Sequence, residues 1–185
     1  MMRALARLTS RLPLARFARD RRGLSAVEFA LIAPLMIALY FGGVEITDGV
    51  AVDRKLGLTA AALANLASQA TVISTTDMNN IFDASTAIIA PYSGATLAMT
   101  ISCIAFDSNK TMSVKWTAYR GTATAPTIVV PSDLQIANTQ LVYSQVSYLY
   151  TPIVGYTITG SLAMSSHLFM APRITAPNYN GTACT

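Results

Sequence analysis

Residues 21–44 read RRGLSAVEFALIAPLMIALYFGGV, and this stretch decides how the chain is organised. From Leu24 to Val44 it runs for 21 residues in which Glu28 is the only charged side chain. At about 1.5 Å per residue, a helix of this length is roughly 30 Å long, which matches the apolar core of a bilayer. We therefore expect residues 24–44 to form a transmembrane helix, in which Pro34 is tolerated as a kink.

The flanks of this run carry opposite charges. Residues 1–23 hold seven arginines and one aspartate, a net charge of +6, whereas the rest of the chain holds six basic and eight acidic side chains, a net charge of −2. By the positive-inside rule, this asymmetry predicts a cytoplasmic N-terminus and a translocated remainder. Because the basic residues are concentrated at one end, the sequence argues against a nucleic-acid-binding face on the main domain.

A conventional secretory signal is the alternative for this N-terminus. Such a signal has an apolar stretch of about 7–15 residues that ends in a small-residue cleavage site. The run here is longer, lacks such a site near its end and continues into helix-compatible sequence, so an anchor is favoured. Only 12% of the residues are charged, against about 25% in ordinary soluble domains, which indicates apolar surface facing lipid or other subunits.

The remainder of the chain predicts an α+β domain that contains a long helix, a short helix and an antiparallel sheet. Alanine-rich sequence predicts that the first helix continues, so that it runs from about 25 to 72, and the helix could be less regular at Gly42–Gly43. A second, shorter helix is expected over 78–90. Alternation and β-branched or aromatic content predict about four antiparallel strands, at 95–106, 112–119, 140–150 and within 155–170, with a helical turn at 131–134 and an irregular tail from Pro172.

Few residues offer chemistry in this domain. Cys103 and Cys184 are the only cysteines, and an exported chain would favour a disulfide between them over two free thiols, although spacing alone leaves both open. His167 is the only histidine, so no metal site of ordinary ligand count is expected. No nucleophile motif or close carboxylate pair accompanies it. We expect no catalytic residues, no cofactor and no small-molecule substrate.

Glu28 is the physically unusual residue of the apolar run. A carboxylate in a membrane-spanning helix is costly, and such residues tend to be functional. Cleavage after Gly23 would supply a partner, because the new α-amino group of Leu24 would lie about one helical turn away, on the same chain or on a neighbouring subunit. The alternative is that Glu28 merely extends to the lipid headgroups in an unprocessed anchor.

The string Gly23-Leu-Ser-Ala-Val-Glu28-Phe29 before an apolar helix resembles the processing site of type IV prepilins, and 21–46 resembles the TadE-like pseudopilins of the Tad (Flp) pilus. Segments 146–155 and 168–173 are similar to later segments of that family. The resemblance implies a basic leader, 1–23, removed by a prepilin peptidase between Gly23 and Leu24, and an assembly or register role for Glu28 and Phe29.

The resemblance also implies an organisation and a location for the chain. After the leader come a transmembrane half-helix at 24–44 and a periplasmic, pilin-like domain at 45–185. The protein would be a single-pass inner-membrane subunit that works with other pilins, pseudopilins and the Tad machinery, either at the base of the pilus or within the filament. Its competitor is an uncleaved, signal-anchored envelope protein whose outer domain binds a ligand or a cell-wall polymer.

Overall fold

The computed structural model describes residues 23–152 and 160–185. Residues 1–22 of the predicted leader, 1–23, and residues 153–155 of the family-like segment 146–155 lie outside the described residues. The chain divides into two compact units, Met1–Gly43 and Val44–Thr185, which are treated separately here. Helix α2, Leu24–Gln69, provides residues to both units.

The first unit contains the apolar half of α2. Its large side chains are exposed along the whole stretch; Leu24 is 59% exposed and Phe29 is 72% exposed. Pro34 lies inside the helix, and the helix continues through Gly42 and Gly43 without interruption, so no break occurs at the two glycines. Residues of this kind are stable on a surface only where lipid or another protein covers them.

In the second unit, α2 is accompanied by the short helix α3, Thr75–Thr86. Ser74 caps α3: its hydroxyl accepts the backbone N–H of Asp77, and the Asp77 carboxylate accepts the N–H of Ser74. The Ser74 hydroxyl also donates to the Asp77 carboxylate at 2.7 Å, and this bond, together with the bond from the Ser74 N–H, lowers the pKa of Asp77. The cap moves the start of the helix three residues ahead of the predicted Met78, and the helix is followed by the 3-10 turn Ala87–Ile89.

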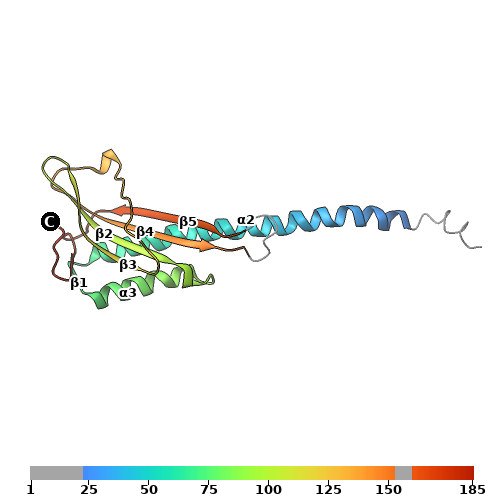
Figure 1. The fold of residues 1–185 in the computed structure, drawn as a ribbon, viewed down its shortest axis with the longest axis horizontal. Coiled ribbons are helices and arrows are strands. Elements are labelled where there is room, and N and C mark those ends of the chain that lie inside the picture. The colour runs from blue at the N-terminus through green and yellow to red at the C-terminus, as the bar shows by residue number, and fades with distance from the viewer. Residues whose placement is uncertain (1–22, 153–159) are drawn as a thin grey trace, which may run out of the picture. The chain divides into compact units, whose positions relative to one another are not determined.

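A four-stranded antiparallel sheet forms the rest of this unit. Its strands are β2 (Ala98–Phe106), β3 (Met112–Arg120), β4 (Gln140–Tyr150) and β5 (Leu162–Met170), arranged in the order β3-β2-β4-β5. Figure 1 shows the strands running lengthwise beside α3 and the C-terminal part of α2. A long helix, a short helix and a four-stranded antiparallel sheet confirm the predicted α+β class. The short turn Ser132–Leu134 also lies where the sequence predicts it.

The main core lies between the two helices and one face of the sheet. Side chains from α2 at helical spacing meet alternate residues of β2 and β4; the core includes Val52, Leu56, Ala60, Leu63, Phe82, Met99, Ile101, Cys103, Val142 and Val146. Ser144 belongs to the same face, and its hydroxyl donates to the carbonyl oxygen of Ala60 at 2.8 Å. The helix backbone is therefore bound directly to the centre of the sheet.

The opposite face of the sheet is covered in part by the connection between β3 and β4. We call residues 121–131 the strap. Its Ile128 and Val130 pack on Ile104, Phe106, Leu141, Tyr143 and Phe169. This second cluster explains why every residue of β2 is buried, although the alternation of its sequence predicts only one buried face. Gly121 begins the strap at φ +72°, where a Cβ atom would lie 2.6 Å from the carbonyl oxygen of Leu97.

Two predictions about the ends of this unit are wrong. The first helix ends at Gln69 rather than at 72, and Val72–Ile73 forms strand β1 instead. The tail is not wholly irregular, because Asn178–Tyr179 forms strand β6, which pairs with β1 in parallel. Two-residue strands leave no periodic signal in a sequence, and their pairing depends on contacts between distant segments.

Candidate functional site

The predicted processing site lies at the start of α2. Gly23 precedes the first helical residue, Leu24, and both are exposed. No other part of the structure lies within 4 Å of the position that a Cβ atom on Gly23 would occupy. A protease that reads this sequence would therefore meet no steric obstacle from the described chain at Gly23.

Glu28 and Phe29 lie in the second turn of the same helix, and both side chains are exposed. Glu28 is one helical turn beyond Leu24, as its sequence position requires. Within residues 23–152 and 160–185, Glu28 forms no hydrogen bond or ion pair. The structure thus presents the carboxylate and the aromatic ring on the outside of an apolar helix, where a neighbouring molecule could contact them.

A second polar group, which we call the base cluster, lies where α2 enters the second unit. It consists of Glu45 and Asp48 from α2, Tyr92, and Tyr148 and Tyr150 from β4. Glu45 is only 2% exposed. Burial raises the pKa of Tyr92 and Tyr150, and the negative charge of Asp48 raises both further. These phenols therefore remain neutral hydrogen-bond donors beside the two carboxylates.

Sequence reasoning missed the base cluster, because it treated Glu45 and Asp48 only as the acidic flank of the apolar run. The spacing of these residues nevertheless indicates which of them share a face. Residues three apart share one face of a helix, and Tyr148 and Tyr150 share one face of a strand. What the sequence lacked was the contact between that helix face and that strand.

The two cysteines form a disulfide in the structure, with their Cα atoms 5.9 Å apart. Cys103 lies on β2 and Cys184 lies beyond β6, and both are fully buried. Nearby, the indole N–H of Trp116 donates to the carbonyl oxygen of Pro177 at 2.9 Å. These contacts attach the C-terminal tail to the core of the sheet.

The Pro-Arg segment near the C-terminus also contacts the long helix. The backbone N–H of Arg173 donates to the carbonyl oxygen of Ser68, and its guanidinium donates to Asn65 Oδ1 at 2.7 Å. A structural role, holding the tail against α2, therefore accounts for Arg173. Tyr148 and Tyr150, from the other family-like segment 146–155, belong to the base cluster.

His167 lies on β5 with its side chain exposed, next to the rings of Tyr143 and Phe169 at 6.0 and 6.1 Å between centroids. Ser166 precedes His167 and lies on the opposite face of the strand, so the two do not form a nucleophile–base pair. In the part of the chain that the structure describes, no group of three or more His, Cys, Asp or Glu side chains could hold a metal ion.

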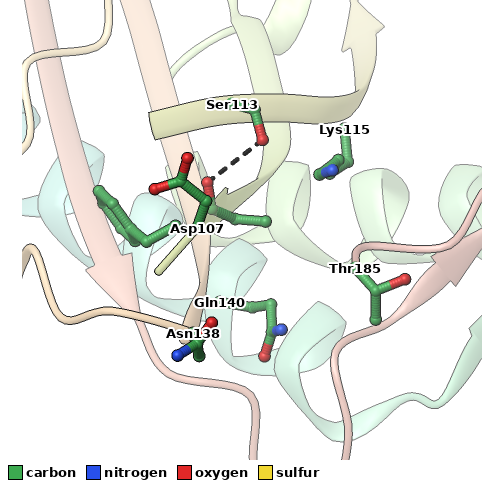
Figure 2. Close-up of a pocket in the computed structure, with 8 residues that line it drawn as sticks. Asp107, Ser113, Lys115, Asn138, Gln140 and Thr185 are labelled. Atoms are coloured by element: carbon green, nitrogen blue, oxygen red, sulfur yellow. Dashed lines mark hydrogen bonds between the residues drawn. The ribbon is translucent and has the colours of Figure 1, made fainter. Parts of the chain in front are cut away.

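A pocket of about 280 Å³ lies near the ends of β2, β3 and β4 (Figure 2). Figure 2 shows Asp107, Lys115 and Gln140 around it, with Thr185 at one side. One oxygen of Asp107 already accepts the backbone N–H groups of Asn109 and Thr111, at 2.8 and 2.7 Å. Its carboxylate thus serves the turn between β2 and β3, and we assign this pocket no function.

The N-terminal half of α2 is long and apolar enough to cross a membrane. Within residues 23–152 and 160–185 it is the one helix of this kind, which indicates single-pass membrane anchoring. A family model described as TadE-like protein matches residues 23–70. The resemblance to TadE-like proteins drawn from the sequence is thereby confirmed over this segment.

The matched range begins at the predicted processing glycine and ends one residue beyond α2. The sheet, α3 and the strap lie outside it. No curated protein and no solved structure matches the chain. The function of the domain beyond α2 must therefore be argued from its own residues.

Proposed function

We propose that the protein is a TadE-like pseudopilin, a minor or accessory subunit for Tad pilus assembly or secretion, which a prepilin peptidase cleaves after Gly23. It is anchored in the inner membrane by α2, with its N-terminus cytoplasmic and its domain periplasmic. It acts without catalysis, by joining other pilins or pseudopilins through its apolar helix. The family match over residues 23–70 supports this role.

The observation that carries the proposal is the arrangement at the start of α2. An exposed glycine precedes an exposed apolar helix, and the only acid of that helix half lies one turn later. After cleavage, the α-amino group of Leu24 and the carboxylate of Glu28 would be opposite charges within reach of each other. In a low-dielectric environment, the attraction between the two charges would offset the free-energy cost of removing each of them from water.

Replacing Gly23 by alanine is expected to abolish processing and to leave a precursor heavier by residues 1–23. The structure has free space for the added methyl group, so the anchor and the domain should fold normally. The measurement is the mass of the membrane-inserted chain by immunoblot and intact mass spectrometry. Ser25→Ala, two residues further along the same exposed helix end, is the matched control and should be processed normally.

N-terminal sequencing of the wild-type protein separates this proposal from its competitor. A chain that begins at Leu24 supports prepilin processing. A chain that begins at Met1 would make a signal-anchored envelope protein the better description, and normal processing of Gly23→Ala would contradict cleavage after Gly23.

Glu28→Leu should leave membrane insertion intact and impair assembly. Removing one partner of a buried ion pair typically costs about 3–5 kcal/mol, which corresponds to a loss of association of roughly 100-fold or more. The measurement is co-purification with the other pilins after gentle solubilisation. Because Ser25→Ala alters the same region without removing a charge, it should co-purify normally. Unchanged assembly of Glu28→Leu would remove the register role from Glu28.

A further inference from the structure

A cleft lies between the strap and the sheet face that is turned away from the helices. Its larger part, a cavity of about 420 Å³, is lined by Thr127 and Val129 of the strap and by Tyr143, Gln145 and His167 of the sheet. A smaller cavity of about 110 Å³ is lined by the earlier part of the strap and by Thr100, Gln145 and Ser147. Gln145 lines both, so the two cavities adjoin along the strap.

The strap is fixed over this cleft rather than loosely attached. Ile128 and Val130 are inserted into the second hydrophobic cluster, and the side-chain amide of Gln135 donates to the carbonyl oxygen of Val130 at 2.8 Å. Between these two anchored residues, Val129 faces outward and is 77% exposed. The alternation of the extended strap thus places one set of side chains in the core and leaves the other beside the cleft.

The polar groups that face the cleft are hydroxyls, an amide and an imidazole. No Asp, Glu, Lys or Arg side chain lines either cavity. A charged ligand would therefore have no counter-charge in the cleft, and it would lose hydration without compensation. A ligand made only of hydrocarbon would leave the hydroxyls and the amide without partners, which is also unfavourable.

Gln145 is held in one orientation. Tyr143 donates its phenolic hydrogen to Gln145 Oε1 at 3.0 Å, and burial raises the pKa of Tyr143, so the phenol remains a donor at neutral pH. With Oε1 occupied, the amide Nε2 is left as the group that can reach a ligand. It forms no hydrogen bond to any residue in 23–152 or 160–185. Next to it, His167 presents an exposed ring at the end of the Tyr143–His167–Phe169 cluster.

We propose that this cleft binds a neutral saccharide. Hydroxyl groups of the sugar would pair with Gln145 Nε2 and with the hydroxyl of Thr127, and an apolar face of the sugar ring would lie on His167 and Val129. The combined volume suits a ligand of one to a few sugar rings, because small-molecule sites usually occupy about 300–1,000 Å³. The proposal does not depend on cleavage at Gly23, and it concerns a bound ligand rather than a substrate.

The test uses the full chain in lipid nanodiscs, with chitotriose and maltotriose as neutral probes and trigalacturonic acid as the charged probe. Binding is measured by saturation-transfer difference NMR and by calorimetric titration. Saturable binding of at least one neutral probe is expected. Gln145→Met should weaken it about tenfold, which corresponds to the loss of one well-placed hydrogen bond.

Gln140→Met is the matched control, because Gln140 lies on the same strand but lines the pocket of Figure 2 instead. It should bind the probe as the wild type does. If Gln145→Met fails to fold, Thr127→Ala tests the cleft from the exposed strap. Absence of saturable binding by both neutral probes, tighter binding of trigalacturonic acid, or wild-type affinity in both cleft variants would overturn the proposal.

Discussion

Replacing Cys103 and Cys184 together by alanine is expected to lower the free energy of unfolding of the C-terminal unit by about 4.5 kcal/mol. The two residues are separated by 81 positions in sequence, and closing a loop of that length removes much of the entropy of the unfolded chain. The native state also loses two buried sulfur atoms beside Trp116. We expect the tail that carries β6 to detach first, since its pairing with β1 spans only two residues on each strand.

This prediction can be measured with the intrinsic fluorescence of Trp116, the single tryptophan of the chain. The full-length protein in detergent micelles is unfolded by urea, and the midpoints of wild type and double variant are compared. Wild type under reducing conditions is the control, because it loses the crosslink and keeps both side chains. It should shift in the same direction as the variant. Equal midpoints for the oxidised wild type and the double variant would show that the crosslink does not stabilise the unit.

Leu56→Ala should be nearly as damaging, at about 2–5 kcal/mol. Leu56 is fully buried in the core between α2 and the sheet, so alanine would leave a cavity at the main contact between the long helix and the strands. Leu58 lies on the same helix only two residues further along, and it is 62% exposed. Leu58→Ala makes the same chemical change at a site with little contact to lose, and it should change stability by less than about 0.5 kcal/mol.

The pair of leucine variants therefore separates packing from helix propensity. Both substitutions replace leucine by alanine, which favours helix slightly, so propensity affects the two alike. The same urea titration gives the difference between them. Equal urea midpoints for Leu56→Ala and Leu58→Ala would mean that Leu56 does not lie on the face of α2 that packs against the sheet.

Much of this fold could be predicted because its signals are local. The apolar run that begins at Leu24 predicts the start of the long helix, and the β-branched and aromatic residues of 140–150 predict β4 with the bounds that it has. The features that were missed depend on distant contacts. The parallel pair of β1 and β6 joins segments about a hundred residues apart, and the burial of both faces of β2 depends on the strap.

The candidate sites divide in the same way. Gly23, Glu28 and Phe29 could be proposed as site residues from the sequence because a linear string of residue types carries the signal. The base cluster could not be predicted, because it depends on contacts of Glu45 and Asp48 with Tyr92 and Tyr150, which are distant in sequence. The saccharide cleft could not be predicted from the sequence either, because its lining comes from an extended connection with no periodic pattern and from the three strands β2, β4 and β5.

The position of the disulfide also sets an order of events during biogenesis. Cys184 follows all four strands of the sheet in the chain, and its partner Cys103 lies in the first of them. The native crosslink can therefore form only after β2, β3, β4 and β5 have all been synthesised and delivered to the same side of the membrane. Until that moment Cys103 is a lone thiol. A cell would have to keep it from pairing with other proteins while the rest of the domain is still emerging.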